Sequence, residues 1–238
     1  MQINAIKTKI FKKGDDINHF ILSNFKKIKE GDVVLITSKI LSLAEGSVVP
    51  FTSFGDKKNI IKKESDYALK TQWAWITMKN RRILASAGVD KSNAKGELIL
   101  LPRDSYVWAQ KIQAILKRKY HIKKLGVIIT DSRTEPLKAG VFGRAIGYAG
   151  IKGLFCYRGV KDIFGKKMRF SRINIPDTLA CAGVFEMWEA AERKPLCIIS
   201  GVPSHFFTNK KANSNEIFIS LTEDMYTPYL SYFLKKDK

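Results

Sequence analysis

Hydrophobic residues recur along the chain at two spacings, and each spacing predicts a different kind of element. Apolar side chains follow helical spacing from Ile17 to Phe25, directly after Asp15 and Asp16, so we expect a helix with one of these aspartates as its N-cap. Further helices are expected over residues 56–70, 104–119, 176–192 and 223–234. Pro176 suits the first position of its helix, since that position needs no backbone donor.

Short, continuous apolar runs predict buried strands. Such runs cover residues 33–36, 125–129 and 196–200. Residues 73–78 and 82–85 flank a turn and predict a hairpin, and strands are also expected over 96–101 and 217–221. Residues 38–46 are expected to form a loop or a helical turn, and the glycine-rich region 140–165 is expected to hold short, bulged strands.

The order of these elements mixes hairpins with long crossovers, which favours an α+β protein with a mixed sheet over a doubly wound one. No stretch rich in proline, glycine or serine marks a domain boundary. We therefore expect one unit over residues 1–238.

Charge changes this picture by pointing to an anionic partner. The 238-residue chain has 42 Lys and Arg against 22 Asp and Glu, a net charge of +20. Its three widely spaced cysteines exclude a disulfide scaffold and give no zinc pattern. No signal peptide or membrane-spanning run is visible, so a cytoplasmic location without membrane association is expected.

Two aspartates that follow predicted strands are the candidates for chemistry. The chain has neither of the common glycine-rich phosphate-binding signatures. Asp131 follows the strand 125–129, and Asp90 follows the strand 82–85 among turn-forming residues. Carboxylates at strand ends suit Mg²⁺ held beside a phosphate. The alternative is that each aspartate caps a turn through its own side chain.

Six sequence blocks, in order, resemble one family. They are GDVVLITSKILSLAEG (31–46), SAGVDKSN (86–93), LLPRD (100–104), GVIITDS (126–132), AIGYAG (145–150) and YRGVKDIFG (157–165). In order and spacing they are similar to the blocks of the coenzyme F420:L-glutamate ligases, the gamma-glutamyl ligases, across about residues 5–202. The remainder, 203–238, is then a C-terminal extension.

The resemblance implies a GTP-dependent ligase that joins L-glutamate to a carboxylate of an anionic, coenzyme F420-like or folate-like acceptor through an acyl phosphate. It also implies an α+β fold in an intertwined homodimer, Mg²⁺ or Mn²⁺ as cofactor and K⁺ as a further candidate cation. Carried over by motif, the metal ligands are Asp90, Asp131, Ser132 and Glu189, the last expected late in the helix 176–192. The nucleotide contacts are Thr8, Lys9, Ile10, Phe11, Ser38, Lys39 and Asn93.

Several positions depart from the family pattern. Leu43 replaces a lysine, Thr8 and Lys9 replace Leu-Pro, and Trp188 replaces a glycine. We expect nucleoside triphosphate binding to persist, supported by Lys9 and Lys39, with a weaker preference for GTP over ATP than in typical family members.

Two other functions remain open at this point. One is a non-catalytic protein on the same fold that binds nucleic acid or an acidic partner through clusters such as 117–119 and 166–167. The other is a different nucleotide- or metal-dependent activity. No RNA-binding signature accompanies the basic clusters.

Overall fold

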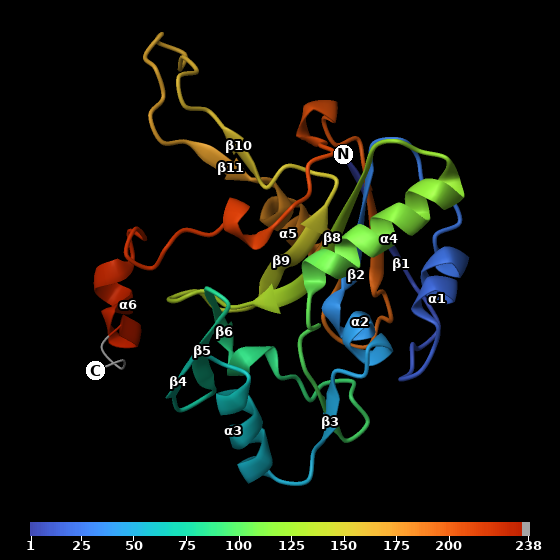
Figure 1. The fold of residues 1–238 in the computed structure, drawn as a ribbon, viewed down its shortest axis with the longest axis vertical. Helices are drawn as coiled ribbons and strands as arrows, with labels where there is room; N and C mark the ends of the chain where they lie inside the picture. Colours follow the sequence, from blue (N-terminus) through green and yellow to red (C-terminus); the bar gives the residue numbers. More distant parts are fainter. Residues whose placement is uncertain (235–238) are drawn as a thin grey trace.

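A mixed five-stranded sheet forms the centre of the computed structural model, which describes residues 1–234 (Figure 1). Its strands, in spatial order, are β1 (Gln2–Ile6), β12 (Leu196–Ser200), β2 (Asp32–Thr37), β8 (Leu125–Arg133) and β9 (Phe142–Ala149). Only the β2–β8 pair is parallel. The predicted α+β class with a mixed sheet is therefore confirmed.

Helices cover both faces of this sheet. One face packs against α1 (Ile17–Asn24), α2 (Ser38–Ala44) and α4 (Ser105–Tyr120), and the other against α5 (Ile175–Met187). Alternate residues of β2 enter the two cores, Val34 and Ile36 on one side and Val33 and Leu35 on the other. Burial on both faces explains why β2 is a continuous apolar run.

A smaller layer lies beside the carboxyl ends of β2 and β8 (Figure 1). It contains the pair β3 (Val48–Pro50) and β7 (Glu97–Ile99), helix α3 (Phe54–Lys63) and the sheet β4 (Tyr67–Lys70), β5 (Trp75–Lys79) and β6 (Arg82–Ala85). Ile61, Ala87, Val89 and Leu98 form its core. The short helix η1 (Ser86–Gly88) leads from β6 to Asp90.

The C-terminal part of the chain adds an arm and a helix. Strands β10 (Leu154–Cys156) and β11 (Arg172–Asn174) begin an arm that projects from the molecule (Figure 1). Two short turns, η2 (Ser204–Phe206) and η3 (Ser214–Glu216), precede α6 (Thr227–Leu234), and the last four residues of the expected extension lie outside the described residues. No helix within residues 1–234 has the length and apolar character needed to span a bilayer.

The two predicted helix starts at Asp16 and Asp104 are confirmed at atomic detail. Asp16 accepts hydrogen bonds from the backbone N–H groups of Asn18 and His19, and Asp104 accepts one from Val107. Each aspartate satisfies donors that have no partner within the helix. Residues 38–46, expected to be a loop or helical turn, form helix α2.

Three predicted elements differ in the structure, the first because strand pairing overrides the local pattern. The basic helix expected over 56–70 ends at Lys63, and Tyr67–Lys70 is strand β4, held in register against β5. The strand expected over 217–221 is absent from the described residues, which assign no strand after β12. The C-terminal helix begins at Thr227, four residues later than expected.

In the first part of the glycine-rich region, the predicted bulge is confirmed but the predicted short strand is wrong. Strand β9 runs for eight residues, although a bulge does interrupt its pairing with β8 between Ile129 and Thr130. A Cβ on Gly143 would lie 2.5 Å from the Ala180 carbonyl oxygen, and one on Gly147 would lie 2.4 Å from the Ser105 backbone. These glycines allow α5 and α4 to pack closely on β9 and do not mark turns.

Candidate functional site

The site lies where the two parallel strands end. Thr37 of β2 pairs with Thr130 of β8, so the residues that follow, Ser38 and Asp131, emerge side by side. Asp131 is still part of β8, two residues before its end, and does not follow the strand as predicted. A cleft of about 1320 Å³ opens here, at the edge where open α/β sheets bind their ligands.

Asp90 and Lys39 form one side of the cleft. A backbone bridge to Ile99 fixes Asp90, and its carboxylate accepts hydrogen bonds from the N–H and the hydroxyl of Ser92 at 2.7 and 2.8 Å. Lys39 Nζ lies 2.7 Å from the same carboxylate. Burial acts to raise the pKa of Asp90, but the contacts from Lys39 and Ser92 prevail and hold that pKa below its ordinary value.

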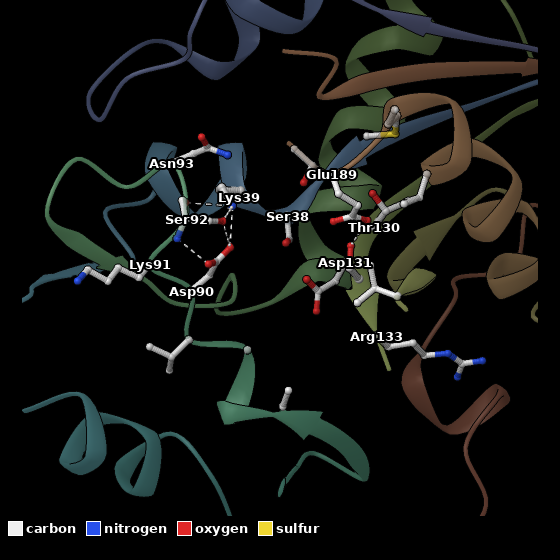
Figure 2. A pocket seen from close by; sticks show the side chains of 18 of the residues that line it. Ser38, Lys39, Asp90, Lys91, Ser92, Asn93, Thr130, Asp131, Arg133 and Glu189 are labelled. Atoms are coloured by element: carbon white, nitrogen blue, oxygen red, sulfur yellow. Dashed lines mark hydrogen bonds and ion pairs between the residues drawn. The ribbon is translucent and has the colours of Figure 1, made fainter. Parts of the chain in front are cut away.

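Asp131 forms the other side, in a more buried setting. Its register partner on β9 is Arg144, whose guanidinium Nη2 lies 3.2 Å from Asp131 Oδ2. Burial raises the pKa of Asp131, and the positive charge of Arg144 offsets only part of that rise. Figure 2 shows the carboxylates of Asp90 and Asp131 on facing sides of the cleft, with Ser38 between them.

Ser132 and Glu189 join the Asp131 side of the cleft. The Ser132 hydroxyl donates to Glu189 Oε1 at 2.6 Å. Glu189 was expected within the helix 176–192, but α5 ends at Met187 because Trp188 adopts φ 64° and ψ −174°. That backbone conformation turns the chain out of the helix and lets Glu189 reach β8.

The predicted nucleotide contacts surround the same opening, in two roles. Lys9 and Ile10 expose their side chains at the rim, whereas Thr8 and Phe11 are buried and anchor the N-terminal loop. The Thr8 N–H donates to the Arg193 carbonyl oxygen at 2.9 Å, and Phe11 belongs to the main core. Asn93 Nδ2 donates to the Ala190 carbonyl oxygen at 3.4 Å, in the same segment as Arg193.

The structure thus brings every predicted site residue to one cleft, while their roles stay predictions. The lining also contains basic residues that the sequence did not single out. They are Lys91, Lys95, Arg133, Arg193 and Lys194. Sequence reasoning missed the buried Arg144 as well, although an arginine within the apolar strand FGRAIGYA was a usable signal.

The oxygen-rich lining suits a divalent metal that also binds a phosphate. Within residues 1–234, no three His, Cys, Asp or Glu side chains gather closely enough to hold a metal ion on their own. The cleft instead offers the carboxylate of Asp90 on one side and those of Asp131 and Glu189 on the other. Mg²⁺ takes few protein carboxylates and completes its shell with water and substrate phosphate, so this donor set fits such an ion.

Comparison with known proteins identifies the family. The family model described as F420-0:gamma-glutamyl ligase matches residues 5–201. A coenzyme F420:L-glutamate ligase from Methanocaldococcus jannaschii is 29% identical over 88% of this chain and 91% of the relative. One from Methanothermobacter thermautotrophicus is 29% identical, over 80% and 84% respectively. A third, from Methanopyrus kandleri, is 30% identical over 79% of this chain and 82% of its own length. The match covers the sheet and both sides of the cleft, and the chain belongs to the family of F420-0:gamma-glutamyl ligases.

Proposed function

We propose that this ligase forms an amide bond between L-glutamate and a carboxylate of a coenzyme F420-type acceptor, at the expense of GTP. A carboxylate oxygen of the acceptor attacks the γ-phosphorus and releases GDP, which gives an acyl phosphate. The glutamate amine then attacks the acyl carbon, loses a proton and expels inorganic phosphate. Each step creates or moves negative charge, so positive side chains in the cleft lower the activation free energy of both steps.

The observation that carries this proposal is the placement of Lys39, Asp90, Asp131 and Glu189 on one cleft in a chain of this family. The basic lining suits a triphosphate and an anionic acceptor. Lys39 contacts both Asp90 and Ser92, which keeps its ammonium group on the Asp90 side of the cleft.

Asp90, Asp131, Ser132 and Glu189 would hold Mg²⁺ or Mn²⁺, and a bound divalent ion would neutralise phosphate charge. The buried Asp131 is oriented by Arg144, and Glu189 by its hydrogen bond from Ser132. These contacts fix the donor atoms before substrates arrive. We propose K⁺ as an additional cation cofactor.

The test combines labelled L-glutamate, GTP or ATP, Mg²⁺ or Mn²⁺, and a deazaflavin acceptor that bears a carboxylate. We expect glutamate incorporation together with stoichiometric phosphate release, dependent on both nucleotide and metal. Nucleotide with metal should also raise the melting temperature, because ligand that binds only the folded state stabilises it. Absence of both responses would overturn the proposal and favour a non-catalytic protein that binds an acidic partner.

We also propose that the enzyme acts as a homodimer, in which the projecting arm contacts the second copy. The arm exposes large apolar side chains, with Ile163 91%, Phe164 89% and Phe170 79% accessible. Exposed apolar groups gathered at the end of an arm are typical of an interaction surface.

A further inference from the structure

The far end of the cleft is apolar, unlike the end that carries the charged residues. Leu69, Ile76, Ile83 and Ala85 line this end and come from the three strands β4, β5 and β6. The register pairs Leu69 with Ile76 and Ile76 with Ala85, so these side chains share one face of the small sheet. Ile83 lies two residues from Ala85 and therefore faces the same way.

This face has no complete cover within the described residues. The opposite face of the sheet is packed, since Thr77 and Leu84 are buried against the layer that contains α3. On the cleft face, Ile76 and Ile83 are 40% and 45% exposed. Adjacent exposed isoleucines in a row across a sheet are unusual unless a ligand or partner covers them.

Helix α6 brings a second apolar wall to the same end. Leu230 and the largely exposed Tyr229 (75%) line the cleft together with the sheet face, although they lie far along the chain from it. Figure 1 shows α6 beside the small sheet. The family model ends at Gly201, so α6 lies outside the residues that it matches.

The cleft has room for more than a nucleotide. Sites for a single small ligand occupy about 300–1,000 Å³, and this cleft encloses about 1320 Å³. The charged end suits phosphates and a reacting carboxylate. The apolar end suits the uncharged body of the second substrate, and a flat ring system fits between a sheet face and a tyrosine ring.

We infer that Tyr229 and Leu230 are specificity-determining residues for the acceptor, which binds with a flat aromatic ring system between α6 and the Leu69–Ile76–Ala85 row. The inference rests on the proposed function, because it assigns the acceptor half of that same site. A deazaflavin and a folate-like pteridine both have a flat aromatic ring system. The side chains of α6 determine which of the two ring systems fits.

The test uses the full chain with Tyr229→Ala, Tyr229→Phe and Tyr226→Ala. Tyr226 is the matched control, since it is 60% exposed just before α6 and does not line the cleft. Tyr229→Ala removes one aromatic stacking contact and should raise KM for the ring-bearing acceptor about tenfold. KM for the nucleotide and kcat should change less than twofold. Tyr229→Phe should restore the wild-type KM, and Tyr226→Ala should leave it unchanged.

Two probes separate this inference from the proposed function. Equilibrium binding of a carboxylate-bearing deazaflavin or a pteroyl compound, followed by ring fluorescence, reads the ring subsite without turnover. A short carboxylate with no ring should bind to the wild-type and Tyr229→Ala chains with equal affinity. Equal ring binding by wild-type and Tyr229→Ala overturns the inference, even when ligation proceeds. Weaker ring binding by Tyr229→Ala supports it, even when no ligation is found. The ring system bound more tightly by wild type identifies the acceptor class.

Discussion

At the residue scale, the two central carboxylates differ because their surroundings differ. Asp90 sits near the surface with Lys39 and Ser92 as hydrogen-bond donors, which lowers its pKa. Asp131 is buried with Arg144, and its pKa is raised. Environments that separate the pKa values of neighbouring carboxyl groups are typical of functional sites, and structural ion pairs can produce them too. Substitution distinguishes a functional role from a structural one.

Asp131→Asn should abolish nucleotide binding that depends on metal. The amide keeps the shape of the side chain but removes the negative charge that a metal ion needs. The variant should also unfold at a lower temperature, because Arg144 loses its ionic partner in a buried position. The measurement is the rise in melting temperature on adding GTP with Mn²⁺, taken relative to each variant without ligand.

Asp16→Asn is the matched control for that substitution. Asp16 caps α1 outside the cleft, and asparagine caps a helix about as well as aspartate. This variant should keep the full nucleotide-induced rise. If Asp131→Asn also kept the full nucleotide-induced rise in melting temperature, the role of Asp131 would be purely structural.

Leu43→Lys should strengthen triphosphate binding. Leu43 lines the cleft from α2, at the position where the family pattern has lysine. Lys39 already has an ionic partner in Asp90, which leaves Lys9 as the exposed cation that the sequence suggested as a substitute. A restored charge-assisted contact is worth about 1.5 kcal/mol, roughly a tenfold gain in affinity.

Titrations of GTP and ATP with Mn²⁺ measure both the gain and the base preference. Leu43→Met controls for side-chain size and should leave both affinities unchanged. We expect wild type to prefer GTP by less than a hundredfold. A larger preference, above about 2.7 kcal/mol, would show that the base contacts are intact despite the substitutions in the surrounding loops.

At the element scale, the end of α5 decides where Glu189 lies. Trp188 has φ 64° and ψ −174°, a combination that residues with a Cβ rarely adopt. The family pattern places glycine at this position, and the observed backbone supplies the reason. The indole of Trp188 is itself 63% exposed, with Lys194 Nζ 5.7 Å from its ring centre.

Trp188→Gly should therefore be more stable than Trp188→Ala by about 1 kcal/mol. Both variants lose the indole and its contact with Lys194, so their difference isolates the cost of a Cβ at positive φ. Urea denaturation of the two variants provides the measurement. A less stable glycine variant would mean that α5 continues past Met187 in solution.

At the scale of the whole molecule, the net charge and the projecting arm determine how the chain meets its partners. Basic residues outnumber acidic ones in the cleft lining, seven to five, so most of the net charge of +20 lies elsewhere on the chain. The arm instead combines basic residues with an exposed apolar end. We assign the cleft to anionic substrates and the arm to the proposed dimer.

Replacing Ile163 and Phe164 together by serine should convert the proposed dimer to monomer. An obligate interface buries about 2,000 Å² or more, and its apolar anchors contribute most of the binding energy. Light scattering at micromolar concentration measures the mass. Phe54→Ser, which removes an equally exposed ring from α3, should leave the dimer intact. A monomeric wild-type chain would contradict the prediction.

The sequence by itself determined the elements whose signal is local and the loops that carry the motifs. Helix α4 with its cap at Asp104, the buried strand β2 and the candidate residues Asp90 and Asp131 all follow from periodicity, capping and motif order. These signals depend on neighbours a few positions away in the chain, so the sequence alone can show them.

Only the tertiary structure decided the features that depend on distant contacts. Strand β9 is long because Gly143 lets α5 pack directly on it, which no local pattern reveals. Arg144 is a site residue because strand register places it opposite Asp131. Tyr229 reaches the apolar end of the cleft because the C-terminal segment returns to the small sheet. Each feature depends on segments far apart in the chain, and only the folded chain brings those segments together.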